Sequence, residues 1–312
     1  MSEKAVLVTT SSFGAADPAP RQALLGAGLS VHENPHKRKL TEAEVGELIE
    51  RVRPVALLAG LEPLTAKVLE AAQPGLRVVS RCGIGLENVD LDCARRLGVA
   101  VCNTPDAPSQ AVAELAIGLM LSVSRHIAKT DAALRRGVWK AEQGRLLGDK
   151  TVGVAGHGRI GARVAQLARG FGCRVLACDE RGVAAPGVEV ADLPRLLRES
   201  DILSLHLPLL PSTRNIIDER ALSSMKPGAL LINTSRGGLI DEAALERALR
   251  EGRLAGGGLD VFEKEPYSGG LLDLPNVVLT PHMGSAAREC RGRMEREAAE
   301  NLLAALREAG VL

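Results

Sequence analysis

The stretch TVGVAGHGRIG, residues 151–161, decides the fold class of this chain. A β-branched run leads into a turn that carries Gly156, Gly158 and Gly161, and a segment of helical periodicity follows. In a dinucleotide-binding turn the first glycine permits the tight bend, the second lets the backbone approach a pyrophosphate, and the third lets the helix pack on the strand. The amino terminus of the helix then offers N–H groups and a partial positive charge to the phosphates. The stretch therefore predicts a phosphate-binding βα turn.

Glycines at this spacing also occur by chance in a chain with 33 glycines, so the surroundings of the turn decide its interpretation. A second expected strand, residues 174–178, ends at Asp179, which lies 18 residues beyond Gly161, close to the spacing of a ribose-binding acid. Asp179 would accept hydrogen bonds from ribose hydroxyls and repel a 2′-phosphate, which favours NAD over NADP as the cofactor. Arg181 could soften that preference. The alternative is an ordinary turn followed by a surface acid.

The overall composition argues against several classes of protein. The chain has 312 residues, enough for two domains of ordinary size, with 39 Lys and Arg against 38 Asp and Glu. This even balance argues against nucleic acid or an anionic membrane as the main partner, since both favour a basic surplus. The sequence shows no apolar run of ~18 residues, no signal peptide and no CxxC pair among six scattered cysteines. We therefore expect a cytoplasmic protein with reduced thiols and no bound metal.

Short β-branched runs alternate with longer segments of helical period, which predicts parallel sheets flanked by helices, an α/β fold. Thr41 with Glu44 is expected to form a capping box, and Asp90 to cap its helix. The segment 111–136 is apolar around much of its circumference, so we expect one long helix buried against another layer or another subunit. The expected strands are residues 5–9, 55–59, 77–80, 99–101, 151–155, 174–178, 202–205, 230–233, 257–261 and 277–280, and the other expected helices are 41–53, 65–72, 91–97, 159–171, 242–250 and 286–308.

Polar segments follow three of the expected strands and carry groups suited to hydride transfer with a nicotinamide cofactor. Such a reaction needs one group that moves the proton of the substrate hydroxyl and a cation that binds a substrate carboxylate. His282, Arg236 and the segment 259–266 each lie where a loop leaves the carboxyl edge of a sheet, and ligands of α/β folds bind at that edge. The planar guanidinium of Arg236 can bind a carboxylate with two hydrogen bonds. An acid packed beside His282 would fix its tautomer and favour its protonated form. Position alone does not separate His282 from a structural histidine.

Seven motifs cover nearly the whole chain. They are SRCGIGLENVD (80–90), NTPDAPSQAVAELAIGLML (103–121), GHGRIG (156–161), HLPLLPST (206–213), NTSRGGLIDE (233–242), GGLDVFEKEP (257–266) and TPHMGS (280–285). Together they resemble the D-isomer-specific 2-hydroxyacid dehydrogenase family, and most nearly its D-3-phosphoglycerate dehydrogenase branch. The resemblance implies an NAD-dependent oxidoreductase that transfers a hydride between the nicotinamide and C2 of a D-2-hydroxy acid or 2-keto acid.

The resemblance also implies residue roles. Arg236 would bind the substrate carboxylate and carbonyl, His282 would move the proton, and Glu265 would hold His282, which leaves Glu263 as a surface residue. Substrate contacts would come from Arg81, from backbone N–H groups at Cys82 and Gly83, and from Arg236 and His282. The implied cofactor contacts are Gly156, Gly158, Arg159, Ile160, Gly161, Asp179, Leu207, Thr234, Ser235, Arg236, Asp260, His282, Gly284 and Ser285.

In the family a Rossmann-type cofactor lobe is inserted into a flavodoxin-like substrate lobe. The resemblance therefore implies a substrate-binding lobe of residues 1–101 with 286–312, an NAD-binding lobe of residues 102–285, and a cleft between them that closes by a hinge motion. The segment 111–136 and the arm through Trp139 resemble the elements that make family members homodimers.

The substrate stays open at this stage. The phosphoglycerate branch places a phosphate-binding arginine where this chain reads Ala59–Pro63 without a cation, although Arg81 matches a second arginine of that branch. Because the sequence ends at Leu312, we also expect no C-terminal regulatory domain of the kind many members have. Both 3-phosphoglycerate and another small 2-hydroxy acid are candidates. The alternative from another class is an NADH-sensing dimeric regulatory protein of the same fold.

Overall fold

The computed structural model describes residues 4–183 and 185–312, which form two compact units, Met1–Pro108 with Ser285–Leu312 and Ser109–Gly284. The first change of unit therefore follows Pro108 and not residue 101 as predicted. The predicted boundary would have cut a strand, because Cys102 and Asn103 pair with Ser80 and Arg81 of the first sheet.

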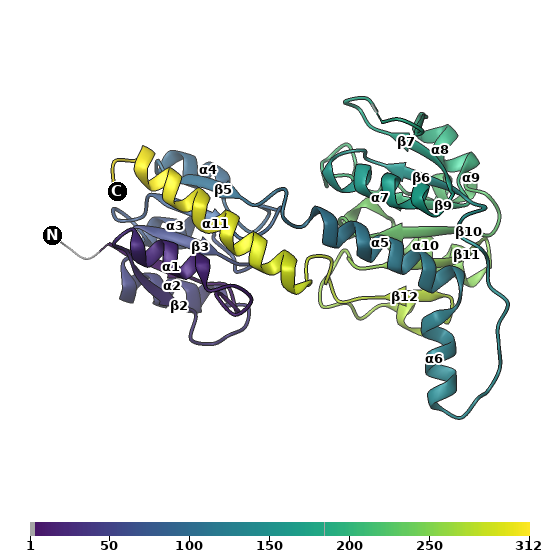
Figure 1. Cartoon of the computed structure of the whole chain (residues 1–312), viewed down its shortest axis with the longest axis horizontal. Helices are drawn as coiled ribbons and strands as arrows, with labels where there is room; N and C mark the ends of the chain where they lie inside the picture. The colour runs from purple at the N-terminus through teal and green to yellow at the C-terminus, as the bar shows by residue number, and fades with distance from the viewer. Residues whose placement is uncertain (1–3, 184) are drawn as a thin grey trace. The chain divides into compact units, whose positions relative to one another are not determined.

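The first unit is a five-stranded parallel sheet in the order β2-β1-β3-β4-β5, with helices on both faces (Figure 1). This is the strand order of flavodoxin-like folds, which confirms the expected architecture. The sequence analysis missed α1 and β2, a short helix and a half-exposed strand. The elements are β1 (Ala5–Val8), α1 (Ala19–Gly26), β2 (Ser30–Glu33), α2 (Glu42–Val52), β3 (Ala56–Ala59), α3 (Ala66–Ala71), β4 (Val78–Arg81), α4 (Leu91–Arg96), β5 (Ala100–Asn103) and α11 (Arg288–Glu308).

Two predicted caps are confirmed in this unit. The Thr41 hydroxyl accepts the backbone N–H of Glu44, whose carboxylate in turn accepts the N–H of Thr41. The Asp90 carboxylate accepts the N–H of Cys93 at 2.8 Å at the start of α4. Such caps replace hydrogen bonds that the first turn of a helix lacks, and each contributes about 1 kcal/mol.

The second unit is a seven-stranded parallel sheet in the order β12-β11-β10-β9-β6-β7-β8. Counted from β6, this is the Rossmann order, which reverses between β6 and β9 and places a ligand crevice at their carboxyl ends. The elements are α5 (Ser109–Ser124), α6 (Ile127–Arg135), β6 (Thr151–Ala155), α7 (Arg159–Gly170), β7 (Arg174–Cys178), β8 (Glu189–Val190), α8 (Leu193–Glu199), β9 (Ile202–Leu205), α9 (Glu219–Ser224), β10 (Ala229–Asn233), η1 (Gly237–Leu239), α10 (Glu242–Arg250), β11 (Leu254–Leu259), η2 (Gly270–Asp273) and β12 (Val277–Leu279).

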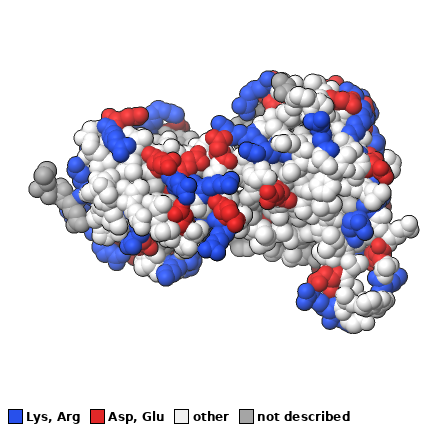
Figure 2. Space-filling view, in the orientation of Figure 1, with Lys and Arg blue, Asp and Glu red and all other residues white. Residues whose placement is uncertain are grey.

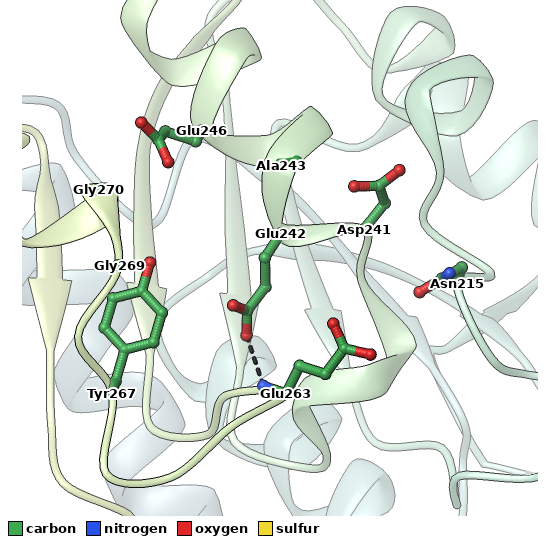
Figure 3. Close-up of a pocket in the computed structure, with 9 residues that line it drawn as sticks. All are labelled: Asn215, Asp241, Glu242, Ala243, Glu246, Glu263, Tyr267, Gly269 and Gly270. Carbon is green, nitrogen blue, oxygen red and sulfur yellow. Dashed lines mark hydrogen bonds between the residues drawn. The ribbon is translucent and has the colours of Figure 1, made fainter.

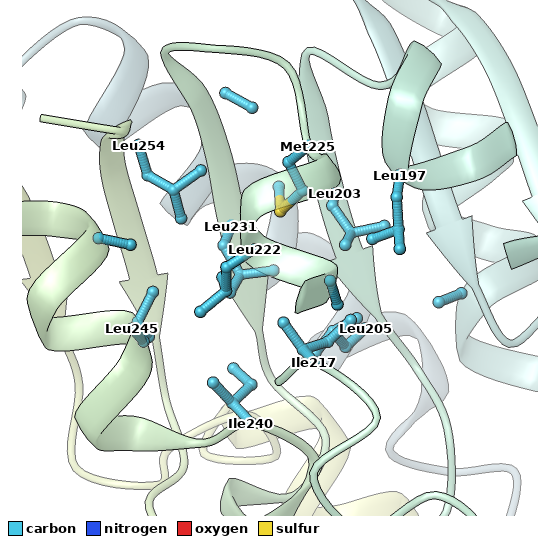
Figure 4. Packing of buried hydrophobic residues seen from close by; sticks show 14 of the residues in the cluster. Leu197, Leu203, Leu205, Ile217, Leu222, Met225, Leu231, Ile240, Leu245 and Leu254 are labelled. Atoms are coloured by element: carbon cyan, nitrogen blue, oxygen red, sulfur yellow. The ribbon is translucent and has the colours of Figure 1, made fainter. Parts of the chain in front are cut away.

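Alternating side chains of β10 build two cores, one on each face of this sheet. Leu231 joins the cluster under α8, α9 and α10, part of which is drawn in Figure 4. Its neighbours Leu230 and Ile232 face the other side and pack with residues of α5 and α7. The strand is buried on both faces and therefore reads as a continuous apolar run.

Glycines of β11 let α5 lie close to the sheet. A Cβ at Gly258 would lie 2.9 Å from the Leu119 Cβ, and one at Gly256 would lie 2.6 Å from the Val123 Cγ1. Both distances are shorter than real side-chain contacts, so larger residues here would push α5 away from β11.

The expected single helix at 111–136 is wrong: α5 and α6 are separate helices bent by 63°. His126, between them, takes a left-handed backbone conformation with φ of 57°. No Gly or Pro marks this break, so the sequence pattern alone runs straight through it. None of the described residues of α6 is buried, and α6 projects from the rest of its unit (Figure 1).

No single helix of the described residues is long and apolar enough to cross a membrane, although the bent pair α5 and α6 meets that test by combined length and composition. Nine of the 16 α5 residues are buried inside the protein. Both signs of charge are mixed over the visible face of each unit (Figure 2).

Candidate active site

The glycine turn between β6 and α7 has the geometry of a phosphate-binding loop. Gly156 has φ of 90°, and a Cβ there would lie 2.4 Å from the His206 carbonyl oxygen. A Cβ at Gly161 would lie 1.9 Å from the Gly156 carbonyl oxygen, so both positions need glycine for the fold itself. At Gly158 a Cβ would meet no described atom within 4 Å. No described residue therefore requires that glycine, whereas a pyrophosphate approaching the start of α7 would.

Asp179 follows β7, and its side chain contacts the glycine turn. Its Oδ2 accepts the backbone N–H of His157 at 2.7 Å, and its Oδ1 accepts the N–H of Arg181 at 2.9 Å. Asp179 therefore ties the second strand to the turn, and its contact with a ribose stays a prediction. Arg159 and Ile160 are the first two residues of α7, directly after Gly158.

The loop after β10 presents Arg236. Asn233 is fully buried, its amide donates to the Arg236 carbonyl at 2.8 Å, and its side-chain oxygen accepts the N–H of Ser235. The Ser235 hydroxyl donates to the Leu207 carbonyl at 2.7 Å, which joins this loop to the end of β9. Thr234 is buried, and its hydroxyl has no partner among the described residues. An orphaned buried hydroxyl at this edge fits a site that a polar cofactor completes.

Glu265 and His282 form a hydrogen-bonded pair beyond the ends of β11 and β12. The Glu265 Oε2 lies 2.8 Å from the His282 Nδ1, and both side chains are partly exposed. The other Glu265 oxygen accepts the N–H of Phe262 at 3.1 Å. Glu263 instead lies exposed beside Arg214, so the acid next to the proline is the one that meets the histidine, as expected.

Buried Asp260 fixes the turn that carries His282. Its carboxylate accepts the Thr280 hydroxyl at 2.6 Å and the N–H groups of Met283 and Gly284 at 2.8 Å each, while its own carbonyl accepts the His282 N–H. His282 has φ of 51°, a left-handed conformation that costs energy in a non-glycine residue and persists where surrounding contacts hold it. The predicted contact of Asp260 with the cofactor stays a prediction. Its observed contacts position the histidine.

Three histidines, His157, His206 and His282, lie at this sheet edge, and among the described contacts only the His282 ring meets a carboxylate. Burial lowers the pKa of His206 to about 3, so His206 is neutral at physiological pH, and its Nε2 bonds the Ser204 hydroxyl. His282 is partly exposed and has a carboxylate partner.

In the first unit, Arg81 ends β4 and its guanidinium donates to the Cys82 carbonyl at 2.9 Å. The backbone N–H of Cys82 donates to the Ala59 carbonyl at 2.8 Å and so continues the pairing of β3 with β4. The expected role of this N–H in binding a substrate carboxylate is therefore wrong in this structure. Gly83 has φ of 141°, and its role in binding the substrate carboxylate stays a prediction. Ser285 falls in the first unit, one residue beyond the end of the second, and not in the cofactor lobe as predicted.

Sequence reasoning did not identify Asn233 or Thr280, the residues whose side chains brace the Arg236 and His282 turns. The available signal was position: each is a short polar residue at or just after a strand end, where such side chains commonly bond to nearby backbone or to a neighbouring turn. Their partners became apparent only with the fold.

Comparison with known proteins gives the family. Residues 117–284 match the model of the D-isomer specific 2-hydroxyacid dehydrogenase NAD binding domain. The chain is 42% identical over 275 residues to a glyoxylate reductase of Thermococcus litoralis, covering 83% of each. It is also 42% identical over 257 residues to a D-3-phosphoglycerate dehydrogenase of Mycobacterium leprae, covering 80% of this chain and 48% of that one. Identity alone thus does not separate these two relatives.

A solved structure agrees over almost the whole length. The crystal structure of a glyoxylate reductase from Paecilomyes thermophila superposes with a TM-score of 0.87 at 33% identity, covering 99% of this chain and 97% of that chain. With the glycine turn, Asp179 and the matched cofactor domain, the chain belongs to the D-isomer-specific 2-hydroxyacid dehydrogenase family of NAD-binding enzymes.

Proposed function

We propose that this protein is an NAD-dependent reductase that converts a short, unphosphorylated 2-keto acid such as glyoxylate or hydroxypyruvate to the corresponding 2-hydroxy acid, reversibly. The contact that carries this proposal is the His282 Nδ1 to Glu265 Oε2 hydrogen bond of 2.8 Å, on the same sheet edge as the glycine turn and the Arg236 loop. It supports proton transfer to or from a substrate oxygen.

Each residue has a distinct role in this proposal. Arg236 binds the substrate carboxylate and polarises the C2 carbonyl. Because the Nδ1 of His282 faces Glu265, its Nε2 is the atom that donates a proton to the C2 oxygen during reduction. Glu265 stabilises the protonated ring before that transfer. Bound NADH supplies the hydride to C2. In the oxidative direction neutral His282 accepts the hydroxyl proton.

Two observations support an unphosphorylated substrate. Two of the relatives are named glyoxylate reductases, and glyoxylate is a small keto acid without a phosphate. At the end of β3, where the phosphoglycerate branch carries a cation, Glu62 is 1% exposed and accepts the Gly60 N–H at 3.0 Å. A buried carboxylate there disfavours a second anionic group on the substrate. We assign Arg81 and Gly83 to substrate binding on the resemblance.

We also propose that the protein is a homodimer through α6 and the segment that follows it. Five large apolar side chains of this region are exposed, Trp139 the most, by 89%. Exposed apolar clusters of this kind mark interfaces. Light scattering after size exclusion is expected to give twice the mass of one chain, and a monomer would refute this assignment. Besides Trp139, the exposed apolar side chains of this region are Ile127, Leu134, Val138 and Leu146.

A substrate panel tests the proposed activity. We expect NADH absorbance to fall with glyoxylate or hydroxypyruvate and much less with 3-phosphohydroxypyruvate, pyruvate or branched 2-keto acids. Replacing His282 by Asn is expected to lower kcat at least ~100-fold, the scale of general acid–base catalysis. Arg236→Lys removes the planar fork and is expected to be similarly severe. Tight NADH binding with no turnover on the whole panel would favour the regulatory alternative.

A further inference from the structure

Glu242, the first residue of α10, reaches across to the loop after β11. Its Oε1 accepts the backbone N–H of Glu263 at 2.5 Å, the dashed line in Figure 3. The start of α10 does not need this carboxylate for capping, because Asp241 already accepts the N–H of Ala244 at 3.0 Å. Glu242 therefore serves the loop and not its own helix.

The position is electrostatically unfavourable for a carboxylate. Burial, and then the negative charges of Glu263 and Glu265, raise the pKa of Glu242, while the Glu263 N–H partly offsets them. The hollow that Glu242 lines, of about 420 Å³, also contains the carboxylates of Asp241 and Glu246 (Figure 3). The hydrogen bond from the Glu263 N–H is therefore the contact that keeps the Glu242 carboxylate in this position.

The loop that Glu242 holds carries Glu265. Phe262, next to the anchored Glu263, donates its N–H to the Glu265 Oε1 at 3.1 Å, and the other Glu265 oxygen faces His282. The Phe262 ring stacks on Tyr267 with centroids 4.3 Å apart. Two successive backbone N–H groups thus link Glu242 to the acid of the proposed proton-transfer pair.

We propose that Glu242 is a positioning residue that fixes the turn of residues 262–265 so that Glu265 faces the His282 Nδ1. It acts through Glu265 and does not touch substrate. The inference rests on the proposed reductase function for its kinetic test, but its geometric content can be measured without turnover.

The kinetic test compares Glu242→Ala and Glu242→Gln in the full-length protein. Loss of the acceptor in Glu242→Ala is expected to lower kcat about tenfold with the Kd of NADH unchanged. The amide oxygen in Glu242→Gln can still accept the Glu263 N–H, so this variant should recover most of the rate. Glu246→Ala is the matched control, because Glu246 lines the same hollow but bonds Arg250 of its own helix.

A double-mutant cycle separates positioning from a general structural role. In a Glu265→Gln background, Glu242→Ala is expected to lower kcat little further, because the Glu265 carboxylate through which Glu242 acts is already absent. An equal tenfold loss in both backgrounds, or wild-type kcat in Glu242→Ala alone, would overturn the inference.

A measurement that needs no turnover distinguishes failure of the Glu242 inference from failure of the proposed reductase function. The His282 Nδ1 proton, read by NMR of histidine-labelled protein, should lose its hydrogen-bonded downfield shift in Glu242→Ala and retain it in Glu242→Gln and Glu246→Ala. An unchanged signal in Glu242→Ala refutes the inference even if no keto acid is reduced. Inactivity of the wild type with the whole panel refutes only the proposed function.

Discussion

The contact between the Arg236 loop and the Glu265 loop gives a sharp prediction, the effect of Gly237→Ala. A Cβ at Gly237 would lie 1.9 Å from the Phe262 carbonyl carbon and 2.3 Å from the Glu263 nitrogen. These are backbone atoms and cannot rotate away. To reach the 3.4 Å at which ordinary contact begins, one loop has to move by about 1.5 Å.

A displacement of that size separates the two halves of the proposed site. The Glu265 to His282 hydrogen bond of 2.8 Å has no slack to absorb it, since such bonds weaken steeply beyond ordinary length. Misplacing catalytic groups by about 1 Å costs on the order of 100-fold in rate. We therefore expect kcat for keto-acid reduction to fall about 100-fold, with overpacking also costing about 1–3 kcal/mol of stability.

Steady-state NADH oxidation well below the melting temperature measures this effect, with NADH affinity and Tm recorded alongside. Gly238→Ala is the matched control, because a Cβ there would meet only flexible side-chain ends of Leu209 and Arg214 at 3.2–3.4 Å. That variant should keep most of its kcat. If Gly237→Ala turned over at the wild-type rate, the idea that the close backbone contact sets the Glu265 geometry would be wrong.

Three further predictions follow from single contacts. Glu265→Gln removes the carboxylate that faces the His282 Nδ1 at 2.8 Å, so kcat for keto-acid reduction should fall about tenfold or more, and an unchanged kcat would contradict the pairing. Asp179→Ser removes the charge opposing a 2′-phosphate, so the ratio of NADPH to NADH efficiency should rise about tenfold or more, and an unchanged ratio would count against the ribose assignment. Leu231→Ala opens a cavity in a fully buried cluster and should lower the unfolding free energy by about 2–5 kcal/mol in urea titrations, with kcat retained.

The glycine turn and the strand ends were predictable because their signals are local. A β-branched run, three spaced glycines and an acid at a fixed distance specify one βαβ unit without knowledge of the rest of the chain. The prediction that Arg236, Glu265 and His282 lie beyond the ends of strands followed from the same strand pattern. The 2.8 Å pairing of Glu265 with His282 agrees with what the family resemblance implied.

The failures have physical causes that periodicity does not contain. The helix break is set by His126 in a left-handed conformation, with no Gly or Pro at the break. The Cys82 N–H is not offered to substrate because it donates to the Ala59 carbonyl. The register between β3 and β4 sets this hydrogen bond, one residue beyond the end of β4. Pairing of residues distant in sequence determines both the unit boundary after Pro108 and the contact of Glu242 with Glu263.

The turns of the proposed site share one construction, from which we expect mutations in the core and mutations beside the functional groups to have different effects. The strands decide where the turns meet, through clusters such as that around Leu231. Buried polar side chains decide where the functional groups point: Asn233 holds the Arg236 turn and Asp260 holds the His282 turn, each through backbone hydrogen bonds. Removing either polar side chain leaves partly or fully buried backbone groups without their hydrogen-bond partner beside the functional residue. Core truncations should therefore lower stability before rate, whereas loss of Asn233 or Asp260 should lower rate in protein that is still folded.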